Sequence, residues 1–301
     1  MAHARHLWQR AAFFQSIRTF FIDREYLEVD TPIRIPAPAP EAFIEPEPAG
    51  DWFLQTSPEL CMKRLLAADF PKIFQICKCF RRQERGDRHL PEFTMLEWYR
   101  RDADYGDLMA DCEQLLPFVA NAMGLGPEIV VGGGKVSLAA PWQRLTVAEA
   151  FSRFGTMSLE DALAEDSFDE VLVRDIEPHL GIATPTFLYD YPAVLGSLAR
   201  LNPENPKVAE RFELYVGGME LANGFSELDD AVEQRSRFEK ERQLITELGR
   251  QPAGPMPESF LAALSNMGPA AGIALGLDRF LMLLLGVQTI DEVVPFTPES
   301  L

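Results

Sequence analysis

The chain contains few of the residues that build disulfide frameworks or sulfur and nitrogen metal sites. Its 301 residues include only 4 cysteines and 4 histidines, and the histidines are scattered at positions 3, 6, 89 and 179. Cys77 and Cys79 lie two apart on an expected strand, but no further ligand is near them in the sequence. We therefore interpret the cysteines as buried, reduced thiols, which is typical of a cytoplasmic protein.

Long hydrophobic runs are also missing. No stretch of about 18 apolar residues occurs, which argues against a membrane-spanning helix. The N-terminal segment MAHARHLWQRAAFF has no apolar core followed by a cleavage site of small residues, so it does not resemble an export signal. We expect a cytoplasmic protein with no membrane partner.

Positive charge is scarce. The chain has 28 lysines and arginines against 46 aspartates and glutamates, for a formal net charge of -18. Binding along a nucleic acid draws on many phosphate contacts, so this composition argues against DNA and against any broad nucleic-acid surface. A small nucleotide held in a local cationic pocket remains compatible with it.

The basic residues that are present gather in one segment, FRRQERGDRHLPEFTMLEWY, which runs from Phe80 to Tyr99. It reads as two strands joined by a loop, and the loop region contains Arg81, Arg82, Arg85, Arg88 and His89. The planar fork of an arginine binds phosphate oxygens bidentately, so the segment suits a polyphosphate. Taken alone, a solvated charged hairpin loop is an equally good interpretation.

Several acids stand in settings that suit chemistry. Glu59 falls in the first turn of an expected helix, while Glu213, Glu220 and Glu227 follow one another at intervals of seven. Such hard oxygen ligands suit magnesium bound together with substrate phosphates, although most single glutamates simply face solvent. Arg279 begins the last helix, where its charge opposes the helix dipole at a cost of up to about 1 kcal/mol. A bound phosphate would compensate for that cost.

Hydrophobic periodicity places strands in adjacent pairs with helices before and after them. This order favours an antiparallel sheet over a doubly wound parallel one. Phe93, Met95, Glu97 and Tyr99 should share one face of their strand, and Pro117 should kink or interrupt its helix. The expected helices are 7–24, one opening at Ser57 as N-cap, 106–123, 231–248 and 278–285; the expected strands include 52–55, 72–81, 92–100, the TFLYDYPA segment, two within 211–229, and 272–276.

Residues 124–205 are the least readable part of the chain. Their GGGKV segment is not a phosphate-binding loop, because the glycine spacing is wrong and Val136 stands where serine or threonine is needed.

Six collinear pieces of the chain resemble the catalytic core of class II aminoacyl-tRNA synthetases of the lysyl type. Within that group the chain most resembles the elongation factor P–(R)-β-lysine ligase family, which are truncated paralogues of lysyl-tRNA synthetase. The resemblance implies an α+β fold with a mixed, mainly antiparallel sheet flanked by helices. It also implies one catalytic domain over 1–301, with a variable insertion at about 124–205 and no anticodon-binding domain. The pieces are LEVDTP, TSPELCMKRLL, FRRQE through PEFTMLEWY, PTFLYDYPA, RFELYVGGMELANGFSEL and GIALGLDR.

The same resemblance implies a role for each matching residue. Arg81 and Arg279 would be catalytic and would hold ATP phosphates, and Glu213 and Glu220 would carry Mg²⁺. The residues implied to bind ATP are Arg81, Arg82, Gln83, His89, Phe93, Glu220, Leu221, Gly276 and Arg279. Those implied to bind the amino acid are Ser57, Pro58, Glu59, Tyr99, Asn223, Phe225, Glu227 and Ala274, with Glu59 on the ammonium nearer the reacting carboxylate and Tyr99 and Glu227 on the distal one. The implied reaction is attack of the amino acid carboxylate on the α-phosphorus of ATP.

Three positions depart from the usual patterns of this synthetase group. Gln83 replaces a glutamate and Leu90 replaces an asparagine in the second motif, so we expect weaker nucleotide contact with binding retained. Ala274 stands where synthetases usually have glycine, and its methyl group would change which amino-group position fits the slot. The absent barrel domain, the acidic surface and Ala274 together favour a protein-modifying ligase, with elongation factor P as acceptor and (R)-β-lysine or lysine as substrate.

Two alternatives stay open. A truncated synthetase could charge tRNA or another small acceptor with lysine, although the acidic surface makes tRNA an unfavourable partner. A catalytically silent paralogue could bind nucleotide as a regulatory module, which the retention of Arg81, Glu213, Glu220 and Arg279 disfavours. We also expect a homodimer built around the strand 27–32, where Pro32 matches the interface proline of the first class motif, and the aromatic helix 7–24.

Overall fold

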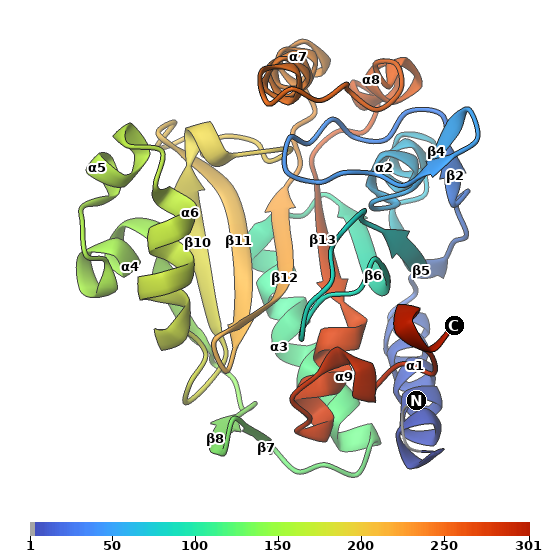
Figure 1. The fold of residues 1–301 in the computed structure, drawn as a ribbon, viewed down its shortest axis with the longest axis vertical. Helices are drawn as coiled ribbons and strands as arrows, with labels where there is room; N and C mark the ends of the chain where they lie inside the picture. The colour runs from blue at the N-terminus through green and yellow to red at the C-terminus, as the bar shows by residue number, and fades with distance from the viewer. Residues whose placement is uncertain (1–3) are drawn as a thin grey trace.

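The structure, a computed structural model, describes residues 4–301. Within these residues eight strands form one mixed sheet (Figure 1). Its strands in spatial order are β1 (Leu27–Glu28), β5 (Lys72–Phe80), β6 (Glu92–Arg101), β13 (Ala270–Gly276), β12 (Met219–Ser226), β11 (Val208–Val216), β10 (Thr186–Pro192) and β9 (Gln143–Thr146). The inner pairs are all antiparallel, while β1 with β5 and β9 with β10 are parallel. The predicted α+β class with a mainly antiparallel sheet is confirmed.

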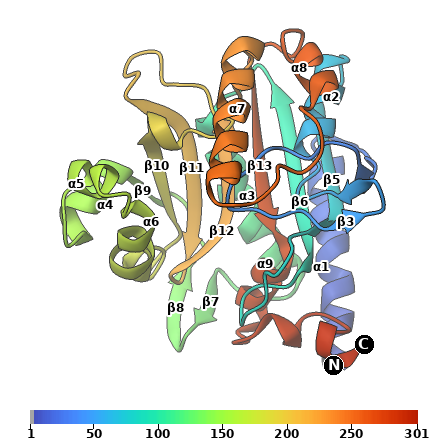
Figure 2. The same cartoon turned by 45° about the horizontal axis from the view of Figure 1, so that its top comes forward.

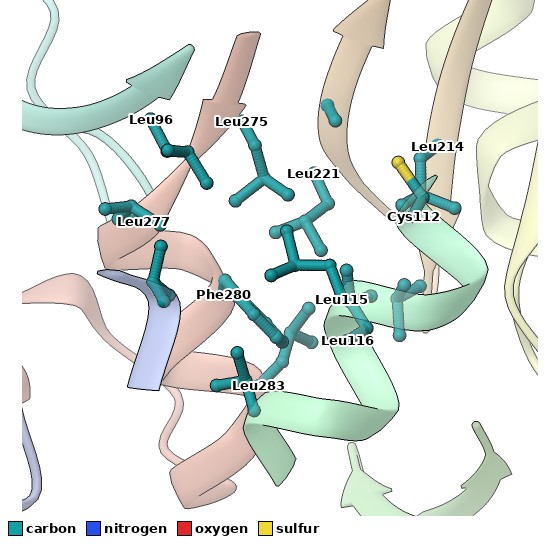
Figure 3. Close-up of a cluster of buried hydrophobic side chains, with 14 of the residues drawn as sticks. Leu96, Cys112, Leu115, Leu116, Leu214, Leu221, Leu275, Leu277, Phe280 and Leu283 are labelled. Carbon is teal, nitrogen blue, oxygen red and sulfur yellow. The ribbon is translucent and has the colours of Figure 1, made fainter. Parts of the chain in front are cut away.

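One face of the sheet is covered by three helices: α1 (Ala4–Ile22), α3 (Tyr105–Ala122) and α9 (Leu277–Leu285). Figure 3 shows side chains of α3 and α9, such as Leu116 and Phe280, meeting Leu96, Leu221 and Leu275 from the strands. Each large apolar side chain buried in this way contributes about 1.5–3 kcal/mol. The cluster therefore fixes where β6, β12 and β13 lie, and their other face is free to carry polar side chains.

The opposite face is covered at one end by α2 (Glu59–Ala67), α7 (Ala231–Glu247) and α8 (Glu258–Leu264) (Figure 2). Over β10 and β11 it is covered by a separate small core. Leu66 of α2, Phe238 of α7 and Phe260 of α8 are buried in one hydrophobic cluster with Ile73 of β5. Because these helices stop short of the rest of the sheet, the middle strands are left with an accessible polar face.

The far edge of the sheet has its own small core. Phe151 and Phe168 stack there with ring centroids 5.1 Å apart, beside Tyr191 of β10. The segment 124–205, predicted as a variable insertion, contributes β9 and β10 to the main sheet. The helices over this edge are α4 (Val147–Phe154), α5 (Leu159–Ala164) and α6 (Phe168–Val171), which a π-helical turn (Leu172–Ile176) and a 3₁₀ turn (Glu177–His179) follow.

Two small sheets complete the described chain. β2 (Arg34–Ile35), β4 (Trp52–Leu54) and β3 (Pro48–Ala49) lie in the proline-rich segment, and β7 (Glu128–Val131) pairs with β8 (Gly134–Ser137). Gly132 and Gly133 form the turn between β7 and β8 with φ of 57° and 83°, a conformation that favours glycine. The glycine cluster is therefore a hairpin turn and not a phosphate loop. Further 3₁₀ turns span Ala193–Leu195, Ile290–Glu292 and Pro298–Ser300.

Two local predictions were wrong. Helix α3 continues through Pro117 without a break, because Leu115, Leu116 and Val119 around it are fully packed in the core. That packing offsets the roughly 3 kcal/mol that an interior proline costs. Helix α2 begins at Glu59, with Pro58 at the cap position, so Ser57 is not its N-cap. Most of the large aromatic side chains of α1, including Phe13, Phe20 and Phe21, are buried in the chain's own core.

No helix within residues 4–301 is long and apolar enough to cross a membrane. The four cysteines are all free, and Cys79 and Cys112 are buried, as predicted; Cys61 and Cys77 are only partly so.

Candidate active site

A cavity of about 370 Å³ opens on the polar face of the middle strands; we call it the catalytic cavity. Its walls come from β6, β12 and β13, the loop between β5 and β6, the turn before α2 and the start of α9. Fourteen of the residues predicted from the sequence line it: Ser57, Glu59, Arg81, His89, Phe93, Tyr99, Glu213, Glu220, Leu221, Asn223, Phe225, Ala274, Gly276 and Arg279. The fold thus brings together residues that are more than 200 positions apart in the sequence.

Arg81 and Arg279 supply the cationic part of the cavity. Arg81 follows β5 directly, and its guanidinium lies 5.2 Å from the ring centroid of Phe93. Its Nε is buried and has no hydrogen-bond partner among the described residues. A buried donor without a partner is costly, and an anion in the cavity would satisfy it.

The position of Arg279 is fixed by its neighbours. Asp278, which precedes it, is buried and accepts hydrogen bonds from Arg10 (2.6 Å) and from the backbone of Thr94 (2.6 Å), which ties α9 to α1 and β6. The guanidinium of Arg279 donates to the carbonyl of Glu220 at 3.1 Å and contacts the ring of His89. Burial and the charge of Arg279 lower the pKa of His89, so its ring is neutral and can accept from the arginine.

Glu213 and Glu220 face the cavity from the neighbouring strands β11 and β12. Glu213 accepts hydrogen bonds from Arg211 and from the hydroxyl of Tyr215, both at 2.7 Å. Burial and the charge of Glu213 raise the pKa of Glu220, and Arg279 opposes them, so that the pKa is about 7. A divalent cation bound between two carboxylates that repel each other would stabilise both in their ionised forms.

This pair fits Mg²⁺ only when further ligands come from the substrate. Among residues 4–301 no group of three or more His, Cys, Asp or Glu side chains is arranged to hold a metal by itself. Mg²⁺ usually keeps several waters and binds through one or two carboxylates plus substrate phosphates. Glu213 and Glu220 are such a pair of carboxylates, and Glu220 lies beside Arg279, which would bind the phosphates.

The acidic part of the cavity centres on Glu97, which sequence reasoning placed on the right face without giving it a role. Its side chain is buried, and Tyr99 donates a hydrogen bond to Oε2 at 2.7 Å. Its Oε1 is buried with no partner among the described residues. Burial raises the pKa of Glu97 to about 8, Glu59 adds to this, and the hydrogen bonds from Tyr99 and Ser57 oppose it. A substrate ammonium would satisfy the free oxygen and favour the ionised form.

Lys63 is a second residue that the sequence did not reveal. It lies one turn along α2 from Glu59, its side chain is 1% exposed, and its Nζ donates to Glu59 Oε1 at 2.6 Å. The same Nζ contacts the carboxylate of Glu227. Burial alone would lower the pKa of Lys63, but the charges of Glu227 and Glu59 outweigh it and raise the pKa. A charged Lys63 therefore joins two of the acids predicted to bind the amino acid.

Of the two buried carboxylates near Tyr99, only one lines the catalytic cavity. Glu227 is fully buried against Lys63 and does not line the catalytic cavity, whereas Glu97 does. Glu97 and Tyr99 therefore face the cavity directly, while Glu227 contacts Lys63 behind the end wall at Gly272.

The end wall of the cavity is built from small residues of β13. A Cβ on Gly272 would overlap the ring of Tyr99 and the carboxylate of Glu227, so only glycine fits there. Ala274 stands in register between Glu97 of β6 and Asn223 of β12 and lines the cavity. The methyl group of Ala274 therefore limits the space between the side chains of Glu97 and Asn223.

Besides Glu227, three predicted site residues lie outside the cavity wall. Pro58 caps α2, and Arg82 points away to pair with Glu45 at 2.8 Å. Gln83 is exposed with φ of 64°, whereas the next residue, Glu84, lines the cavity. Gln83 therefore lies on the surface, and the acid that lines the cavity here is Glu84, 3.9 Å from the guanidinium of Arg81. Leu90, the other departure, is buried and lines the cavity.

The fold and this site define a class of protein. A family model described as tRNA synthetases class II (D, K and N) matches residues 2–300, and the chain belongs to this class.

Within the class, the chain belongs to the elongation factor P–(R)-β-lysine ligase family. The proteins of that name from Proteus mirabilis (strain HI4320) and Klebsiella pneumoniae (strain 342) are 39% and 40% identical to it, over 98% and 97% of this chain and 95% and 94% of their own lengths. The one from Pectobacterium carotovorum subsp. carotovorum (strain PC1) is 40% identical over 99% of this chain and 96% of its own.

Proposed function

We propose that this protein is an ATP-dependent ligase that activates (R)-β-lysine as an aminoacyl-adenylate and transfers it to a lysine side chain of elongation factor P. One observation carries the proposal on the structural side: a single cavity joins a cationic part at Arg81 and Arg279 to an acidic part at Glu59 and Glu97. ATP suits the first part and a diamino acid the second. The relatives named above carry the same activity in their names.

In the first step the substrate carboxylate attacks the α-phosphorus of ATP, and pyrophosphate leaves. Arg81 would hold the α-phosphate beside the reacting carboxylate, and Arg279 would hold the phosphates that depart. Mg²⁺ on Glu213 and Glu220 would supply charge neutralisation when bound. Positioning and electrostatic stabilisation of this kind account for most of the catalysis in such displacements, so no side-chain nucleophile is needed.

The acidic part sets the substrate class. Glu59 would meet the ammonium nearer the carboxylate, and Glu97 with Tyr99 would meet the distal one. Asn223, Phe225 and Ala274 line the slot that holds the substrate. A substrate with two ammonium groups needs an acid at each end, which a neutral or acidic amino acid does not.

Exchange of pyrophosphate into ATP tests the activation step. Arg81→Ala, Arg279→Ala and Glu220→Gln should each lower the exchange rate by about 10² to 10³, because each removes a group that stabilises developing charge. Arg235→Ala is the matched control, since Arg235 forms an exposed surface pair with Glu258. Normal exchange in all three site variants would show that the site is wrongly assigned.

Competition between acceptors tests the transfer step. Purified elongation factor P, tRNA, ATP and labelled (R)-β-lysine are supplied together, and the label is followed by mass spectrometry. We expect a base-resistant amide on the protein and no label on tRNA. A base-labile ester on tRNA alone would support a truncated synthetase instead. The acidic chain, with net charge -18, repels tRNA at long range, which favours the protein acceptor.

A further inference from the structure

Glu41 lies where the catalytic cavity meets a second cavity. The second cavity, of about 360 Å³, is walled by the proline-rich segment 39–53 and by residues around the C-terminal end of α7, including Arg242 and Arg250. Glu41 and Ile44 line both cavities. In Figure 1 the blue segment that carries them runs beneath α7 and α8, across the end of the sheet. ATP and the amino acid would fill the catalytic cavity, so a third reactant has to arrive past its rim.

The backbone beside Glu41 is held firmly. Ala42 is 1% exposed, and its amide donates to the carboxylate of Glu241 at 2.8 Å. Its carbonyl accepts from the guanidinium of Arg250. Both partners belong to α7 or the turn after it, so the helix fixes the position of the neighbouring Glu41 carboxylate.

The side chain of Glu41 is not used structurally. It has no hydrogen bond or ion pair with any other residue of the described chain, in contrast to Glu59 and Glu97. The charged groups that act on it are Arg81, Glu59, Glu241 and Arg211. Burial raises the pKa of Glu41 to about 7; Arg81 and Arg211 oppose this, and Glu59 and Glu241 reinforce it. It is therefore close to Arg81, where the reacting phosphate would lie, and it exchanges protons near neutral pH.

The transfer step has a chemical requirement that the residues assigned so far do not meet. A lysine side chain has a pKa of about 10.4 and is an ammonium at neutral pH, so it must lose a proton before it can attack. Arginines stay protonated, Glu59 is paired with Lys63, and Glu97 would bind the distal substrate ammonium at the amino-acid end. A free carboxylate at the rim is the group that can accept this proton.

Resting on the proposed function, we propose that Glu41 is the general base that deprotonates the acceptor amine. The acceptor ammonium gives one proton to the Glu41 carboxylate, and its nitrogen lone pair attacks the carbonyl carbon of the adenylate. As the new C–N bond forms, the C–O bond to the α-phosphate breaks and AMP leaves with that electron pair. The second proton of the attacking nitrogen passes to water, which leaves a neutral amide.

Single-turnover transfer from preformed adenylate tests this role. The acceptors are elongation factor P, a small lysine peptide and hydroxylamine, whose amine is already neutral at pH 7. Glu41→Gln should slow transfer to both lysine acceptors by about 10² to 10⁴, the usual contribution of a general base. Transfer to hydroxylamine should be unaffected, and Glu41→Asp should restore part of the lysine rate. With the wild-type protein the lysine rate should rise through pH about 7, and this step should disappear in Glu41→Gln.

The matched control is Glu47→Gln, on the same segment but lining neither cavity, which should transfer at the wild-type rate. The inference is overturned if Glu41→Gln transfers to lysine acceptors at the wild-type rate, or if hydroxylamine is slowed by the same factor. If the lysine peptide shows the dependence on Glu41 but elongation factor P is never modified, the inference stands and the proposed protein acceptor is wrong.

Discussion

Lys63 gives the acidic part of the cavity its charge balance. A buried ammonium pairs with Glu59 and Glu227, whereas Glu97 lines the cavity and forms no ion pair among the described residues. The Nζ of Lys63 also lies 5.0 Å from the ring centroid of Phe225, which adds a cation–π contact. Lys63 thus balances the charge of the acids around the substrate slot and does not itself line the catalytic cavity.

Replacing Lys63 should destabilise the fold in a way that depends on pH. Lys63→Met leaves two carboxylates uncompensated in the interior, so we expect a loss of about 3–5 kcal/mol in the free energy of unfolding at pH 8. Near pH 5 the loss should be smaller, because the acids can protonate and remove the buried charge. Urea unfolding at the two pH values measures both effects.

The control for that measurement is Lys78→Met. Lys78 pairs with Glu92 at 3.3 Å on the surface, with exposed fractions of 42% and 55%, so its loss should cost no more than about 1 kcal/mol. Equal destabilisation by the two variants would contradict the buried ion-pair network.

Glu97 should couple substrate binding to proton release. Its pKa is raised to about 8, so at pH 7 it is mostly protonated in the free protein. A bound ammonium favours the ionised form, so binding expels up to one proton. Affinity should rise by nearly tenfold per pH unit well below the pKa and less steeply as the pH approaches 8. Calorimetry in phosphate and in Tris measures the released proton as a difference in heat. Glu97→Gln is the control, and equal heats with the unaltered protein would refute the coupling.

At the scale of single elements, β13 determines how much room the slot has. Its residues alternate, so that Gly272, Ala274 and Gly276 line the cavity while Ala271 and Leu275 are packed in the core. We expect Ala274→Gly to narrow the preference for (R)-β-lysine over lysine, because one methyl group contributes about 1–3 kcal/mol to such discrimination. The ratio of kcat/KM for the two substrates is the measurement.

Ala271→Gly is the matched control for Ala274→Gly. It makes the same change in the same strand on the opposite face, where Ala271 is buried in the hydrophobic cluster. It should lower stability and leave the substrate ratio as it was. A wild-type protein that prefers lysine, or a ratio that moves as much in the control, would show that Ala274 does not select the substrate.

The elements also show what the sequence could predict. Strands β5, β6, β12 and β13 were predictable because each repeats a local pattern of period two, and the sheet then aligns the predicted residues on one face. Lys63 was not, since a lysine four positions after Glu59 in a helix looks like an exposed surface pair. Only the contact with Glu227, from a distant strand, makes it a buried one.

Glu41 was not singled out from the sequence, and the prediction at Pro117 was wrong, for a related reason. Glu41 sits in an irregular proline-rich segment, where no periodicity tells which way a side chain points, and α7 fixes its position through Ala42. At Pro117 the proline does destabilise the helix, but the burial of α3 in the core stabilises it by more. In both cases tertiary contacts decided the outcome.

At the scale of the whole molecule, the edge of the sheet at β1 is where a second copy would bind. β1 is only two residues long and has a neighbour on one side, β5, so its other edge is open. Ile22 at the end of α1, Leu27 on β1 and Ile33 beyond it are 57%, 49% and 42% exposed. The predicted dimer therefore rests on these aliphatic residues and on Trp8, because the phenylalanines of α1 are largely used in the chain's own core.

We expect the protein to sediment as a homodimer at micromolar concentration, with this edge in the interface. Leu27→Lys should weaken the dimer by about 30-fold or more, because a central apolar residue of an interface contributes at least about 2 kcal/mol. Val232→Lys is the control, since Val232 is 80% exposed at the start of α7, away from the open edge. The added positive charge is the same in both variants, so any general relief of repulsion in a chain of net charge -18 affects them equally. A monomer in the unaltered protein, or equal weakening by the two variants, would remove β1 from the interface.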